Sequence, residues 1–154
     1  MNPTPTPPPT ATVEQYKAYL QDLGNVGSRY ATSNGFYLSV ITALLGILSV
    51  MKPGQGLSDL QDILRLAVPL FAVGLCFVWH KTIHFYRNLF TTKFAVLKEM
   101  EENGRLFPAY EREFTLFPSK QWLTKNEARI PLFLALPFLV IFISTIWKLL
   151  THVA

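Results

Sequence analysis

The sequence predicts an all-α integral membrane protein with three transmembrane helices, the second of them short, and with a long helix and a small cap on the cytoplasmic side. Two observations predict this class. Half of the 154 residues are hydrophobic and only 16% are charged, whereas a soluble domain carries about a quarter charged residues. The uncharged residues also gather into three long runs, and a helix needs about 20 apolar residues to cross the hydrocarbon core.

The chain opens with a Pro/Thr-rich segment, residues 1–11, which we expect to be a disordered tail. Residues 12–30 then place apolar side chains at every third or fourth position, and Thr12 with Gln15 forms a capping-box pattern. This pattern predicts a cytoplasmic amphipathic helix that leads into the first span.

Residues 30–51 contain no charged side chain and predict the first transmembrane helix. Residues 130–150 predict the third transmembrane helix, with a kink at Pro137. The second span, residues 63–80, is shorter, because only 15 residues separate Arg65 from Lys81. The Arg65 side chain can extend toward the interface and lengthen the apolar stretch. A buried or re-entrant helix is the alternative for this segment.

The orientation follows from the positions of Lys and Arg. The connection at residues 52–62 has no basic residue after Lys52, and it carries Asp59 and Asp62. It should therefore face outward. Residues 81–129 hold nine basic residues and should be cytoplasmic, as should the N-terminus.

Residues 81–129 divide into a helix and a cap. The helical spacing of apolar residues continues from Ile83 to Leu97 and ends at the Asn103-Gly104 turn. Aromatic residues punctuated by prolines follow, and they predict a cap too small to be a catalytic domain: Phe107, Tyr110, Phe114, Phe117 and Trp122.

One face of the first span consists of small or hydroxyl-bearing residues: Gly35, Ser39, Thr42, Gly46 and Ser49. Small faces let helix backbones approach closely in lipid, which favours helix packing, within or between subunits. The alternative is a pore lining, with the hydroxyls facing water. The opposite face should meet lipid: Leu38, Ile41, Leu45 and Leu48.

Several polar and aromatic residues mark the membrane interface: Trp79, His80, His84, Arg87 and Trp147. His80 and His84 have a zinc-compatible spacing, but nothing near them completes a ligand set, so we expect no metal and no cofactor. Glu99, Glu101 and Glu102 alternate with lysines, as on a solvated helix surface. No catalytic motif and no basic nucleic-acid patch is visible, so we expect neither an enzyme nor a nucleic-acid partner.

The order of these features resembles the RipA family of small bacterial membrane proteins. The resemblance extends over about residues 14–145 and rests on dispersed positions: Arg29 to Leu38, Trp79, Tyr86-Arg87, Lys93-Phe94, Glu99 to Glu101, Phe107-Pro108, Glu111 to Phe114, Glu127 and Ile130-Pro131. Phe107 stands where leucine is expected, and Phe114 where tryptophan is expected. The resemblance implies an octameric homo-oligomer of the bacterial inner membrane, without known enzymatic chemistry and linked to envelope adaptation and virulence.

Taken together, these features predict a multi-pass, non-enzymatic homo-oligomer in a bacterial inner membrane, with a cytoplasmic N-terminus, acting as a scaffold or regulator. Its expected partners are further copies arranged as a ring, membrane lipids and an unidentified cytoplasmic protein. The alternative is a pore-forming effector that depolarises the membrane in stress or in anti-phage defence.

Overall fold

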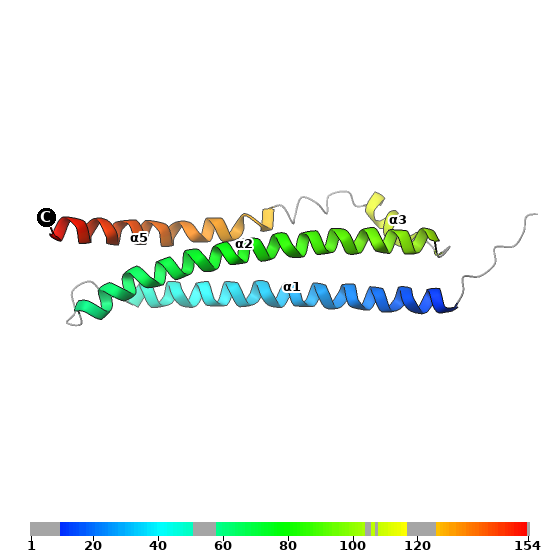
Figure 1. Cartoon of the computed structure of the whole chain (residues 1–154), viewed down its shortest axis with the longest axis horizontal. Coiled ribbons are helices and arrows are strands. Elements are labelled where there is room, and N and C mark those ends of the chain that lie inside the picture. The colour runs from blue at the N-terminus through cyan, green and yellow to red at the C-terminus, as the bar shows by residue number, and fades with distance from the viewer. Residues whose placement is uncertain (1–9, 51–57, 104–105, 107, 117–125, 154) are drawn as a thin grey trace, which may run out of the picture. The chain divides into compact units, whose positions relative to one another are not determined.

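The computed structural model describes residues 10–50, 58–103, 106, 108–116 and 126–153, and these residues contain helices and no strand. Helix α1 runs from Thr10 to Val50, α2 from Ser58 to Asn103, α3 from Ala109 to Leu116 and α5 from Ile130 to Val153 (Figure 1). The predicted all-α class is confirmed.

Three helices, α1, α2 and α5, are long and apolar enough to cross a membrane. Helix α1 has 41 residues and α2 has 46. At about 1.5 Å per residue, each is about twice as long as the hydrocarbon core is thick. Only part of α1 and of α2 can therefore lie in lipid, in agreement with the predicted long helix beyond the second span.

The helix ends differ from expectation in three places. Thr10 and Ala11, expected in the disordered tail, already belong to α1. Helix α2 begins at Ser58, inside the expected loop at residues 52–62, and continues unbroken through residues 63–80. Helix α5 extends past residue 150 to Val153. The rest of the predicted tail, residues 1–9, lies outside the described residues.

Pro69 lies inside α2 and its side chain is fully buried. A proline within this helix was not among the features predicted from the sequence. Proline removes one backbone hydrogen bond, but membrane helices tolerate it where neighbouring helices surround the freed group. The burial of Pro69 is consistent with that rule.

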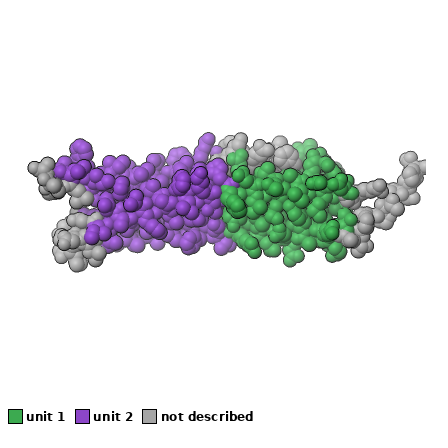
Figure 2. Space-filling model, in the orientation of Figure 1, with its two compact units in different colours: residues 1–30, 85–125 green, residues 31–84, 126–154 purple. Residues whose placement is uncertain are grey.

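The chain divides into two compact units (Figure 2). Unit 1 comprises residues 1–30 and 85–125, and unit 2 comprises residues 31–84 and 126–154. Within unit 2, side chains from α1, α2, α5 and the turn before α5 form an apolar core: Ile41, Pro69, Ala72, Cys76, Trp79, Ile83, Ala128, Pro131, Ala135 and Phe138.

Aromatic rings connect the helices of unit 1. Tyr30 of α1 contacts Tyr86 and Phe90 of α2, with ring centroids 5.2 Å and 6.1 Å apart. Phe94 of α2 stacks on Tyr110 of α3 at 4.6 Å, with the ring planes nearly parallel. Aromatic pairs of this kind contribute about 0.5–1.5 kcal/mol beyond the area they bury. The Tyr30 pairs therefore connect α1 to α2, and the Phe94–Tyr110 stack connects α3 to α2.

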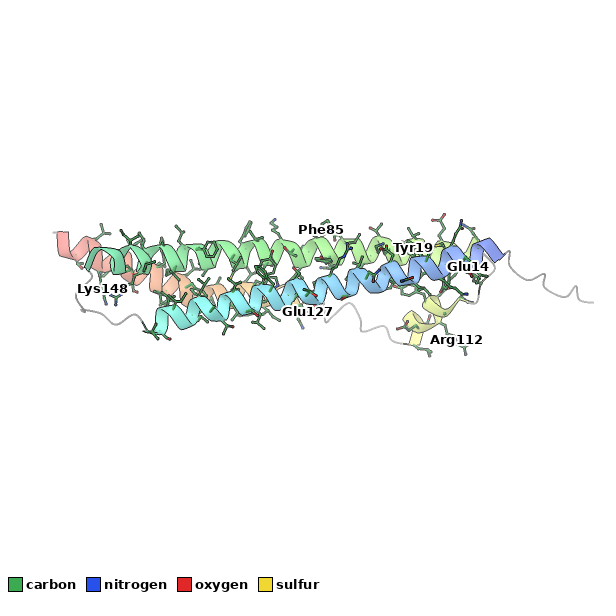
Figure 3. All side chains as sticks on the ribbon, turned by 90° about the horizontal axis from the view of Figure 1, so that it is seen from below. Glu14, Tyr19, Phe85, Arg112, Glu127 and Lys148 are labelled. Carbon is green, nitrogen blue, oxygen red and sulfur yellow. The ribbon has the colours of Figure 1, made fainter. Side chains whose placement is uncertain are left out.

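Polar contacts between α1 and α2 centre on Lys93. Its ammonium group pairs with Asp22 and lies 5.0 Å from the centre of the Tyr19 ring, while the Tyr19 hydroxyl donates to the Lys93 carbonyl. Figure 3 labels Tyr19 on α1. The hydrogen bond to Asp22 raises the pKa of Lys93, so its ammonium group stays protonated at neutral pH.

Candidate oligomerisation surface and buried polar groups

The predicted stripe of small residues lies on the exposed surface of α1. All five members are exposed: Gly35, Ser39, Thr42, Gly46 and Ser49. A Cβ atom added at Gly35 or Gly46 would meet nothing within 4 Å beyond its own helix. At these two glycines, no described residue of another helix packs against the stripe.

The hydroxyl groups of the stripe are bonded within α1. Ser39 donates to the Gly35 carbonyl at 2.8 Å, Thr42 to the Leu38 carbonyl at 2.8 Å, and Ser49 to the Gly46 carbonyl at 2.7 Å. In hydrocarbon a hydroxyl group needs a hydrogen-bond partner within the protein, and these three find theirs in their own helix. The stripe therefore offers a surface of small groups that need no water.

The expectation that Leu38, Ile41, Leu45 and Leu48 face lipid is wrong for most of that face. Ile41 is 1% exposed, and Leu45 and Leu48 are half-buried, whereas Leu38 is 50% exposed. The side of α1 that carries Ile41 packs inside unit 2. In a membrane protein both the lipid-facing surface and the core are apolar, so hydrophobicity alone does not distinguish them.

Trp79 lies inside unit 2 and is 5% exposed. Its indole N–H donates to the Asn34 side-chain oxygen at 2.8 Å, and its ring stacks on Tyr37 at 5.9 Å. The Tyr37 hydroxyl in turn lies 3.2 Å from the Thr82 hydroxyl. Trp79 was predicted as an interface residue, whereas Asn34 was not predicted as its partner, although an amide side chain within an uncharged apolar run was the available signal.

His80 and His84 lie next to each other on α2, with ring centroids 4.6 Å apart. His80 Nδ1 is 2.6 Å from the Ala128 carbonyl oxygen, so that nitrogen carries the hydrogen and donates it. No group of three or more metal-ligating side chains occurs among the residues described. His80 thus links α2 to the turn before α5.

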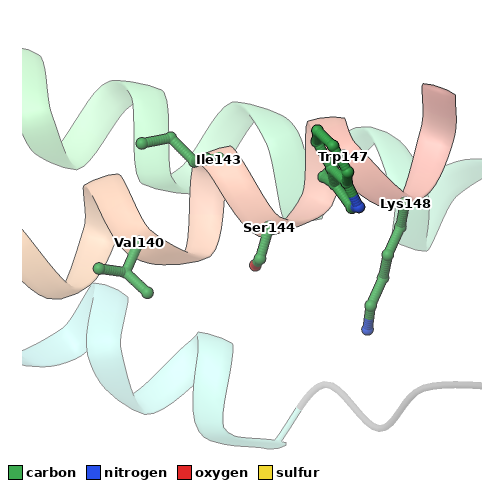
Figure 4. A pocket seen from close by; sticks show the side chains of 5 residues that line it. All are labelled: Val140, Ile143, Ser144, Trp147 and Lys148. Carbon is green, nitrogen blue, oxygen red and sulfur yellow. The ribbon is translucent and has the colours of Figure 1, made fainter. Parts of the chain in front are cut away.

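Arg87 lies half-buried on α2 in unit 1, whereas Trp147 is well exposed near the end of α5. Trp147 lines an open hollow of about 510 Å³ on α5, together with Val140, Ile143, Ser144 and Lys148 (Figure 4). This part of α5 is an uncovered apolar surface. Whether these residues lie at a membrane interface stays a prediction.

Glu101 is the buried charged group of unit 1, at 2% exposed, and the expectation of a solvated surface is wrong for it. One oxygen accepts from the Tyr16 hydroxyl at 2.7 Å and from the Tyr110 backbone N–H at 3.2 Å. The other is buried without a hydrogen-bond partner in the described part of the chain. Because Tyr110 is in the first turn of α3, the carboxylate also caps that helix.

Tyr16 lies ahead of the predicted first span, and its environment keeps it protonated. Burial, the hydrogen bond to Glu101 and the charge of that carboxylate raise the pKa of Tyr16 to about 12. Its hydroxyl therefore remains a donor to Glu101 at any physiological pH. This contact connects the beginning of α1 to the last turn of α2.

Comparison with known proteins matches the chain to one family of membrane proteins. The model of the octameric membrane protein family matches residues 13–147, which is most of the chain. No curated protein and no solved structure matches the sequence of this chain. The resemblance drawn from the dispersed positions is thus confirmed at the level of a family of octameric membrane proteins, and the chain belongs to the octameric membrane protein family.

Proposed function

We propose that the protein is a non-enzymatic scaffold or regulator that works as a closed homo-oligomer in a bacterial inner membrane, with its N-terminus in the cytoplasm. The observation that carries the proposal is the exposed small-residue stripe of α1, which has no covering helix at Gly35 and Gly46. Close helix contact through small residues drives association in lipid. A family of octamers supplies the partner, a second copy of the chain.

The hydrogen bonding of the stripe supports packing over a pore lining. The three hydroxyls of Ser39, Thr42 and Ser49 have acceptors in their own helix, so they gain little from facing water. The stripe also contains no charged residue that would select an ion. Lipids then surround the assembly, and unit 1 is the part available to a cytoplasmic protein.

The assembly role is tested by adding bulk to the stripe. Gly46→Leu should separate the packed backbones and shift the purified protein from the octamer to smaller species. The control is Ile47→Phe, which enlarges a side chain that is already 46% exposed beside the stripe. An unchanged octamer in Gly46→Leu contradicts the proposal.

The scaffold role is separated from the pore-forming alternative by conductance. Protein reconstituted into liposomes should not conduct, and overexpression should leave the membrane potential of the cell intact. Steady conductance that changes in Thr42→Val would overturn the scaffold role and favour a pore lined by the stripe.

A further inference from the structure

Helix α5 carries a second exposed stripe, made of large side chains. Its members recur every three or four residues and are each more than half exposed: Phe133, Leu136, Val140, Ile143 and Trp147. The opposite side of the same helix is buried in unit 2 through Ala135 and Phe138. We call these five residues the α5 ridge and the five small residues of α1 the α1 stripe.

Two hydrogen bonds fix the relative height of α1 and α5 within unit 2. Asn34 of α1 bonds Trp79, and Ala128, just before α5, bonds the next residue, His80. Asn34 and Ala128 therefore lie at about the same level along α2. From these points α1 and α5 run in the same direction, while α2 runs in the opposite one (Figure 1).

Helix α5 begins at Ile130, just after the turn that contains Ala128, and helices rise by about 1.5 Å per residue, so equal steps from Asn34 and from Ala128 reach heights that agree to within about one helical turn. Ser39 and Phe133 are each five residues on, and Thr42 and Leu136 are each eight residues on. The same holds for Gly46 with Val140 and for Ser49 with Ile143. Four small residues of the α1 stripe thus lie level with four large residues of the α5 ridge.

The structure therefore points to one pairing: we infer that the α5 ridge of each subunit packs into the α1 stripe of the next, with large side chains of the ridge against small residues of the stripe over the same stretch of the membrane. This inference rests on the proposed homo-oligomer and names its two contact faces. In a ring about an axis perpendicular to the membrane, equivalent atoms keep the same depth, so level residues meet. Two different faces on each subunit give the head-to-tail contact that closes a ring.

Helix α2 also has an exposed face, and that face fits the α1 stripe less well. Its large side chains form groups about seven residues apart, with Ala67 and Gly74 between them: Ile63, then Leu70 and Phe71, then Phe77 and Val78. The α5 ridge instead has a large side chain at every third or fourth residue. Since association in lipid depends on van der Waals packing, the face with large side chains at every height is the better partner.

Disulfide cross-linking tests the pairing in the full-length protein, with Cys76→Ala as background. We expect Thr42→Cys with Leu136→Cys to give, on oxidation, a ladder of products up to the octamer. The matched control, Thr42→Cys with Phe71→Cys, places the second thiol at about the same height on α2 and should give only the uncross-linked chain on a denaturing, non-reducing gel. Thr42→Cys alone should also give only the uncross-linked chain, because a disulfide-linked dimer there would mean that two α1 stripes meet.

The native size of each variant is measured before oxidation, which separates two kinds of failure. If the Cys76→Ala protein is not oligomeric before oxidation, both the proposed function and the pairing are contradicted. An octamer that cross-links through Phe71→Cys, through Thr42→Cys alone, or not at all overturns the pairing and leaves the oligomer intact.

A second test, without cysteines, enlarges a side chain on one face of the contact and shortens the side chain opposite to it. Gly46→Val should weaken the octamer, and adding Val140→Ala, which makes room at the same height, should restore it. The control is Leu70→Ala, which removes bulk from an exposed position on α2. Equal rescue by Val140→Ala and by Leu70→Ala, or no rescue by Val140→Ala, overturns the pairing.

Discussion

Glu101 serves two donors that come from different helices, the Tyr16 hydroxyl of α1 and the Tyr110 amide of α3. Alanine at this position leaves both donors without that acceptor in a buried site, where an unsatisfied group costs about 1–3 kcal/mol. We therefore expect Glu101→Ala to lower the melting temperature of the purified protein more than Tyr16→Phe, which removes one donor only. Melting of Glu101→Ala at the wild-type temperature contradicts this role.

Among the elements, α3 depends on α2 for its place. Its eight residues are too few to be stable as an isolated helix, and the Phe94–Tyr110 stack and the Glu101 cap hold it. Tyr110→Ala should increase amide hydrogen exchange in residues 109–116, whereas Tyr110→Phe keeps the ring and should not. The octamer should persist in both, because Tyr110 belongs to unit 1 and the α1 stripe to unit 2. Equal exchange in the two variants contradicts the dependence on the stack.

For the whole molecule, the distribution of charge sets the expected topology. The nine basic residues between Lys81 and Arg129 should keep that segment in the cytoplasm, and the connection around Asp59 should be outside. In a Cys76→Ala background, Gln55→Cys should react with a membrane-impermeant thiol reagent added to intact cells, and Gln121→Cys should react only after lysis. Labelling of Gln121→Cys in intact cells would contradict the predicted orientation and show that this segment lies outside.

The membrane class of this protein and the order of its long helices can be predicted from the amino-acid sequence. Charge-free runs long enough to cross a bilayer are visible without coordinates, because a hydrocarbon core excludes charge at every position of a span. The continuation of α2 to Asn103 and the small-residue face of α1 could also be predicted, since both follow from helical spacing within one segment.

The tertiary structure decided which faces point inward. Ile41 and Leu38 are both apolar residues of one helix, yet one is buried and the other exposed, because that depends on where α2 and α5 lie. Glu101 resembles its neighbours in a charged run, and only the approach of Tyr16 and Tyr110 makes it a buried acceptor. The level match between the α1 stripe and the α5 ridge depends on contacts of Asn34 and Ala128 with α2, residues far apart in sequence. Helical periodicity describes one segment at a time, whereas burial and register depend on which segments pack together.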